Sequence, residues 1–103
     1  MRSTLDEFTW YIMDAMADDW ESLDQIVPHI EHFVGSTDRS RVALLLVDLV
    51  SEGELQEMKL SPEQQLTTEM IMKTPIKYWF SMTPHGRALW DSEGHKYRDE
   101  SMA

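Results

Sequence analysis

The first stretch of the chain repeats apolar residues at the spacing of an α-helix. A stripe forms when residues advance by 100° each, and it consists of Leu5, Phe8, Ile12, Ala15 and Met16. Thr4 and Glu7 have the spacing of a capping box, in which each side chain satisfies a backbone N–H of the other residue. We therefore predict a helix over residues 4–19 that begins at Thr4 and turns this stripe towards the core.

A second apolar stripe follows the same predicted helix, a quarter to a third of a turn away. It consists of Trp10, Met13, Ala17 and Trp20. Together the two stripes make a wide apolar arc for a helix at the edge of a domain. Either the last helix of the chain folds back over the second stripe, or the stripe is the interface of a homodimer, because large exposed apolar patches mark interaction sites. Both explanations stay open, and these four residues are candidates for dimerisation.

Two further helices are expected before residue 53. Ser22 and Gln25 form a second capping box, and the helix that follows carries Pro28, which should kink it or mark a restart. Gly35 reads as its stop, and a new cap lies within residues 36–38. The third helix is expected to reach Glu52 and end at Gly53, with a core stripe of Val42, Leu45, Leu46 and Leu49.

After Gly53 the period changes from that of a helix to that of a strand. Residues 55–60 make a plausible short strand, and Ile76, Tyr78, Phe80 and Met82 alternate through a second one. The link over 61–75 is helix in part or loop, since Ser61-Pro62-Glu63 resembles a helix start. Thr83-Pro84 repeats that signal for a last helix that ends at Gly94. We predict one domain over residues 1–94, mainly α with a small β-hairpin (α+β), and a flexible tail over 95–103.

Two local motifs, in this order of elements, resemble a winged helix-turn-helix domain. Leu49-Val50-Ser51-Glu52-Gly53-Glu54-Leu55 resembles the end of a recognition helix that leads into the wing. Phe80-Ser81-Met82-Thr83-Pro84-His85-Gly86-Arg87 resembles the return strand and turn of regulators of the multiple-antibiotic-resistance and phenolic-acid-repressor types. The resemblance covers most of residues 4–93 and implies DNA binding through the third helix and the wing. The positions that it assigns to DNA are Arg39, Ser40, Arg41, Lys73 and Lys77.

The outer face of the expected third helix departs from that family pattern. A recognition helix presents polar side chains that hydrogen-bond to base edges. Here the outward positions hold Ala43, Leu44 and Val47 beside Asp48, which repels phosphate. Trp79 lies on the strand face opposite Phe80 and is the best candidate for an exposed aromatic residue. We expect Ala43, Leu44, Val47 and Trp79 to bind a protein partner, since apolar and tryptophan side chains anchor such interfaces.

The charge of the chain changes the balance between these two functions. The net charge is −10, and the first 35 residues hold one basic residue against eight acidic ones. Nucleic-acid-binding proteins usually carry a basic patch, because phosphate contacts dominate their affinity. The acidic chain therefore favours a basic protein partner and disfavours DNA.

Candidate chemistry is sparse. His29 and His32 share one helical face and could hold a metal if further ligands came from Glu31, His85 or His95, but this spacing is common by chance, and the chain has no cysteine. The glycines fit stops or turns, and no nucleophile is paired with a base. We predict no enzyme activity, no metal and no cofactor. Because there is neither an apolar membrane-length run nor a leader, a cytoplasmic protein is expected. The leading hypothesis is a non-catalytic winged-helix module for protein–protein interaction, and the alternative is a DNA-binding transcriptional regulator.

Overall fold

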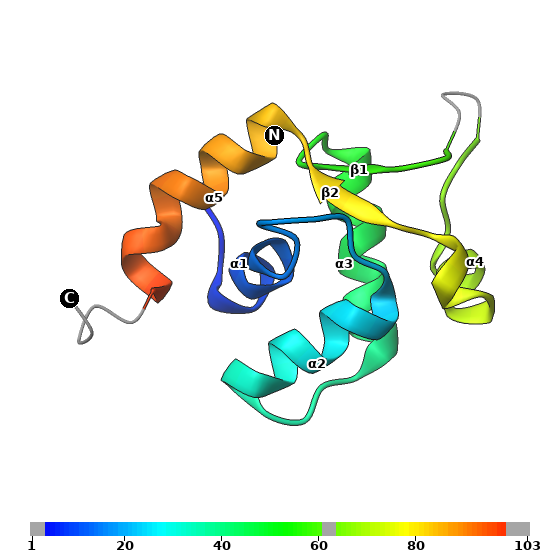
Figure 1. Ribbon diagram of the computed structural model, residues 1–103, viewed down its shortest axis with the longest axis horizontal. Coiled ribbons are helices and arrows are strands. Elements are labelled where there is room, and N and C mark those ends of the chain that lie inside the picture. Colours follow the sequence, from blue (N-terminus) through cyan, green and yellow to red (C-terminus); the bar gives the residue numbers. More distant parts are fainter. Residues whose placement is uncertain (1–3, 61–63, 99–103) are drawn as a thin grey trace.

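The computed structural model describes residues 4–60 and 64–98 and shows a mainly helical domain with a small antiparallel sheet (Figure 1). The elements in chain order are α1 (Glu7–Asp14), α2 (Leu23–Val34), α3 (Arg39–Ser51), β1 (Leu55–Glu57), α4 (Thr68–Lys73), the 3-10 turn η1 (Pro75–Lys77), β2 (Phe80–Met82) and α5 (Pro84–Tyr97). The predicted α+β class is confirmed.

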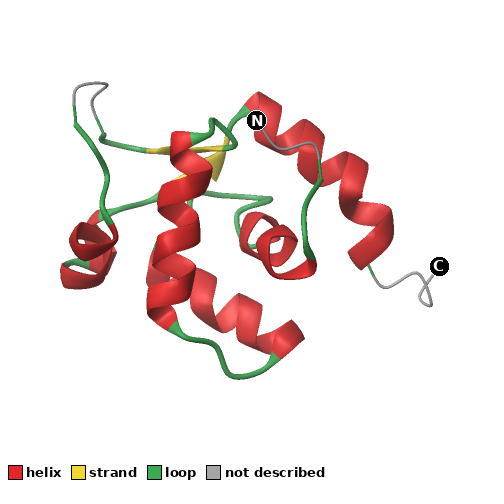
Figure 2. Cartoon of the chain, turned by 180° about the vertical axis from the view of Figure 1, so that it is seen from behind, coloured by secondary structure: helices red, strands yellow, loops and turns green. Residues whose placement is uncertain are grey.

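The helices surround one apolar core. In both views α1 lies in the middle, α5 lies on one side of it, and α2 and α3 lie on the other, while α4 packs beside α3 at the far end (Figures 1 and 2). Of the residues that the sequence patterns turn towards the core, Ile12, Leu46, Leu49 and Phe80 are buried, and Ile30 of α2 is buried with them. Phe8 and Leu45 pack against that core and are half-buried.

The first helix is shorter than predicted at both ends. Asp6, not Thr4, caps it by accepting a hydrogen bond of 2.7 Å from the backbone N–H of Thr9. The backbone N–H of Leu5 instead donates to the carboxylate of Glu93 on α5, so the chain reaches the helix in an extended conformation. After Asp14 the chain tightens into a turn in which Ala17 N–H donates to the Asp14 carbonyl. The contact with α5 thus accompanies a start of α1 that lies later in the chain than the capping pattern at Thr4 predicted.

Three other helix starts follow the sequence signals. Gln25 accepts a hydrogen bond of 2.8 Å from the backbone N–H of Ser22, which forms the expected capping box of α2. Asp38 caps α3 through Ser40, and Thr83 caps α5. Pro28 lies inside α2, which continues through it to Val34 without a restart. The cap residues therefore act as local chemistry predicts.

The sheet consists of two strands of three residues each. Leu55 pairs with Met82 and Glu57 pairs with Phe80 in an antiparallel register. Glu21 adds an isolated bridge, because its backbone N–H and carbonyl both hydrogen-bond to Phe80, at 3.0 and 2.8 Å. The segment between α1 and α2 is thereby tied to β2.

We call the segment that joins β1 to β2 the wing, residues 58–79. The wing contains α4 and η1. Residues 61–75 were expected to be helix in part or loop, and residues 68–73 are helical. The start signal at residues 61–63 lies outside the described residues. A strand from Ile76 to Met82 was predicted, and its first half is wrong. Pro75 begins a 3-10 turn and Ile76 is 71% exposed, because proline fixes its own φ and brings no N–H to a strand ladder.

The last helix continues past its predicted end at Gly94 to Tyr97. The hydroxyl group of Tyr97 donates a hydrogen bond of 2.5 Å to the carbonyl of Leu5. Within the turn that opens α5, Gly86 packs directly on the Glu54 carbonyl, where a Cβ atom would clash. Residues 95–98 of the expected tail are thus part of the folded domain, and the rest of that tail lies outside the described residues.

Candidate interaction surface on α3 and the wing

The outer face of α3 is apolar at its centre. Leu44 is 54% exposed, Val47 is half-buried and Asp48 is exposed. Ala43 was predicted to face outwards, and this is wrong: it is fully buried. The inward face of α3 is rotated towards Val42 and Ala43, which leaves Leu45 half-buried at its edge.

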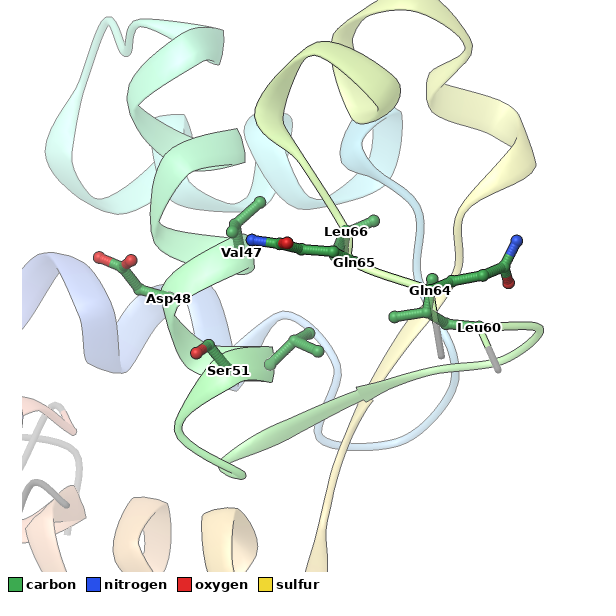
Figure 3. A pocket seen from close by; sticks show the side chains of 8 residues that line it. Val47, Asp48, Ser51, Leu60, Gln64, Gln65 and Leu66 are labelled. Carbon is green, nitrogen blue, oxygen red and sulfur yellow. The ribbon is translucent and has the colours of Figure 1, made fainter. Parts of the chain in front are cut away.

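A groove of about 630 Å³ lies beside this face, between α3 and the start of the wing (Figure 3). Its lining residues are Val47, Asp48, Val50, Ser51, Leu60, Gln64, Gln65 and Leu66. Half of them are apolar, and the side chain of Gln65 reaches across towards Val47 in Figure 3. The groove therefore combines apolar walls with amide, hydroxyl and carboxylate groups, a composition that suits the side chains and backbone of a protein segment.

Further along, the wing exposes three apolar side chains. Met58 is 48% exposed, Met72 is 39% exposed and Ile76 is the most exposed of the three. Trp79 was expected to be exposed and is half-buried. Its indole N–H donates a hydrogen bond of 2.7 Å to the carbonyl of Ile76, which holds the ring against its own segment. The exposed apolar surface of the wing thus comes from the neighbours of Trp79.

The arginines assigned to DNA contact other helices of the same chain. Arg39 forms an ion pair of 2.6 Å with Asp24 on α2. The guanidinium group of Arg41 lies 3.8 Å from the centre of the Phe8 ring on α1. Ser40 hydrogen-bonds to Asp38 through its hydroxyl group and its backbone N–H. These contacts direct the start of α3 towards the body of the domain.

The other two residues assigned to DNA lie on the wing. Lys73 ends α4 and Lys77 ends η1, and both side chains are exposed. Both elements are separate from α3, which carries Arg39 and Arg41. The five positions therefore come from three different elements, and the two arginines among them already have partners.

Two acidic residues of the hairpin are buried, which the sequence analysis missed. Glu57 accepts hydrogen bonds from the backbone N–H groups of Trp79 (2.8 Å) and Lys59 (2.9 Å), so it joins the two ends of the wing. Glu54 is fully buried, and its carboxylate lies 3.9 Å from His85 Nε2. The available signal was the alternation of β1, which puts Glu57 on the same face as the buried Leu55.

The stripe proposed for dimerisation is in large part interior. Trp10 and Met13 are buried, and Ala17 and Trp20 are half-buried. The Trp10 ring stacks on Trp90 of α5 at 6.0 Å, and its indole N–H donates to the Trp90 carbonyl. The first of the two explanations holds for Trp10, which α5 covers, and Met13 is buried in the core, so neither residue forms an exposed dimer surface.

The perturbed carboxylates have structural causes. Glu93 is buried, and the backbone N–H of Leu5 and the ammonium of Lys96 hold its pKa below the ordinary value. Hydrogen bonds from Ser40 lower the pKa of Asp38. Burial, together with nearby Asp19, raises the pKa of Glu21. Each shift belongs to a helix end or an element junction, away from the α3 groove.

His29 pairs with Asp14 at 3.0 Å, whereas His32 packs edge-on against Phe33. Across the described ranges, residues 4–60 and 64–98, three or more potential metal ligands do not come together. In those same ranges no helix has both the length and the apolar character needed to cross a bilayer.

Comparison with protein-family models, curated proteins and solved structures finds no match for this chain.

Proposed function

We propose that this chain is a non-catalytic interaction module of winged-helix type, which binds a basic protein partner through the outer face of α3 and the wing. The order of its elements supports the winged-helix assignment, since three helices precede the β1–β2 hairpin and a closing helix follows it. The observation that carries the function is the exposed Leu44 beside the groove, where a DNA-reading helix would present hydrogen-bonding side chains.

Charge identifies the kind of partner. The net charge of the chain is −10, and the exposed Asp48 of α3 lines the groove, while the exposed Glu52 caps the C-terminal end of that helix. A basic surface would be attracted over a longer distance than a neutral one and oriented by these acids. The apolar walls of Val47, Val50 and Leu66 then suit an apolar side chain of that partner.

DNA binding is the second candidate function, and it rests on the exposed Lys73 and Lys77 together with the order of elements. The contacts of Arg39 with Asp24 and of Arg41 with Phe8 weigh against it, because binding phosphate would require these side chains to leave their partners.

Site-specific photo-cross-linking in the native cell tests the proposal. A benzoylphenylalanine at position 44 reports on the outer face of α3, and the same group at the exposed Ala88 of α5 is the control. We expect a discrete adduct with a basic protein from position 44 only, and its loss when Val47→Asp is added. Adducts that nuclease removes, adducts between two copies of this chain, or equal yields from both positions would contradict it.

A further inference from the structure

A second hollow, distinct from the α3 groove, lies between α1 and the C-terminal ends of α2 and α5. It has a volume of about 420 Å³ and is lined by Trp10, Tyr11, Asp14, Phe33, Tyr97 and Arg98. The C-terminal ends of α2 and α5 lie on the same side of α1 in both views (Figures 1 and 2). Four of its six lining residues are aromatic, and they come from three helices.

The four rings enclose the hollow at different tilts. Tyr11 stacks on Phe33 with ring centres 4.4 Å apart, whereas Trp10 meets Tyr11 edge-on at 80° and Tyr97 at 41°. Trp10 and Tyr11 are buried and form the floor, and Phe33 at the rim is 47% exposed. Aromatic faces carry negative partial charge, so rings set around a hollow attract a cation.

The polar groups of the hollow already have partners within the chain. Asp14 accepts from the indole N–H of Trp90 at 3.2 Å and pairs with His29. The hydroxyl group of Tyr11 donates to the Tyr97 carbonyl at 3.0 Å, and that of Tyr97 donates to Leu5. The hollow is therefore lined by aromatic rings and a carboxylate, and its polar groups already have hydrogen-bond partners within the chain. A cation without N–H donors suits it better than ammonium or guanidinium, both of which need acceptors.

The chain's own Arg98 lines the hollow and places a cation beside Trp10 of that lining and beside Trp90, which lies outside it. Its guanidinium carbon lies 4.7 Å from the Trp90 ring centre and 5.9 Å from that of Trp10. Arg98 folds back across Gly94, where a Cβ atom would come within 2.6 Å of the guanidinium carbon. Its ion pair with Asp91 is exposed and 3.3 Å long, so little holds the side chain in place. Arg98 can therefore leave the rings when a better-suited cation competes.

We propose that this aromatic hollow binds a quaternary ammonium group. Such a cation spreads its charge over methyl groups, which contact ring faces and desolvate easily. The net charge of −10 raises the local concentration of cations around the chain. The same chemistry occurs on a free choline-type molecule and on a trimethylated lysine side chain, and the test separates these two sources.

The test is a titration of the intact chain at constant ionic strength, followed by the tryptophan fluorescence and the aromatic proton signals. The probes are choline, a short peptide with one trimethyllysine, its unmodified counterpart and 3,3-dimethylbutanol, the uncharged analogue of choline. We expect choline or the trimethylated peptide to bind about tenfold more tightly than its own uncharged or unmodified control, a difference of about 1.4 kcal/mol. Tighter binding of the peptide assigns the site to trimethyllysine, and tighter binding of choline assigns it to a small molecule. Equal binding of choline and dimethylbutanol, without a preference between the peptides, would overturn the proposal.

Two variants separate the site from an unspecific effect of charge. Arg98→Ala removes the internal competitor and should tighten binding about two- to fivefold, although it also removes a positive charge from the chain. Phe33→Leu keeps the apolar volume at the exposed rim and should weaken binding by the same factor. Ala88→Ser, at an exposed position of α5, is the control and should leave the affinity unchanged. Weaker binding by the Arg98→Ala variant together with tighter binding by the Phe33→Leu variant, both with unchanged circular dichroism, would contradict the proposal.

Discussion

The backbone N–H of Leu5 donates a hydrogen bond of 2.8 Å to the carboxylate of Glu93, which lies 88 residues further along the chain. This bond attaches the entry of α1 to α5. Because Leu5 and Lys96 favour the charged form, the pKa of Glu93 in the folded chain is below its ordinary value of 4.5. Its contribution to stability is therefore complete above that value and disappears as the pH falls towards the lowered pKa.

Glu93→Gln tests this link, since it removes the charge and keeps the size of the side chain. We expect a lower melting temperature than that of the wild type at pH 7, and a difference that shrinks as the pH falls below 4.5. Thermal unfolding by circular dichroism across this range measures both. A difference that is constant with pH would show that the charge of Glu93 contributes nothing.

The core face of α3 gives a second prediction. Leu46 and Leu49 are fully buried, so truncating either to alanine should lower the free energy of unfolding by about 2–5 kcal/mol. Leu44→Ala, on the exposed face of the same helix, should change it by less than about 0.5 kcal/mol. Urea denaturation compares the three variants. Equal losses at positions 44 and 46 would show that the orientation of α3 is different.

Gly86 carries a third prediction, because the Glu54 carbonyl occupies the place of a Cβ atom. Gly86→Ala must push α5 away from the hairpin, which should cost about 1–3 kcal/mol of stability although alanine favours helices. Ala88→Ser, at an exposed position of the same helix, serves as the control for substitution in α5. A Gly86→Ala variant more stable than the wild type would contradict the close contact.

Glu57 gives a fourth prediction. Glu57→Ala leaves the N–H groups of Lys59 and Trp79 without their acceptor, which should lower the free energy of unfolding by about 1–3 kcal/mol. The fluorescence of Trp79 should also shift as the wing loosens. Gln56→Ala, at the exposed neighbouring position, should leave both unchanged. Because the chain has four tryptophans, the comparison is repeated in a Trp79→Phe background, where the shift must vanish. A shift that persists in that background would contradict the prediction.

Local chemistry made the caps of α2, α3 and α5 predictable, because each cap joins a side chain to a backbone N–H only two or three residues away. Gln25 accepts from the N–H of Ser22, Asp38 from that of Ser40 and Thr83 from that of Gly86. The features that the sequence analysis missed depend on contacts between distant segments. The start of α1 depends on Glu93, and the burial of Glu57 depends on the backbone of Trp79.

The candidate site divides in the same way. The outward position of Leu44 followed from the helical period, whereas Ala43 was misplaced because a small rotation of α3 decides which edge of its apolar face is covered. The partners of Arg39 and Arg41 come from α2 and α1, and no spacing in the sequence relates them.

The central claim is that the outer face of α3 binds protein and does not read DNA, and selection from a random duplex library tests it most directly. At physiological salt we expect no enriched sequence and a Kd for duplex DNA no tighter than about 10⁻⁴ M, the weak end of non-specific binding. The acidic chain repels phosphate, and Leu44 offers no hydrogen bond to base edges. Recovery of a palindromic motif bound at about 10⁻⁸ M or tighter, with binding lost in the Arg39→Ala and Arg41→Ala double variant, would contradict the claim.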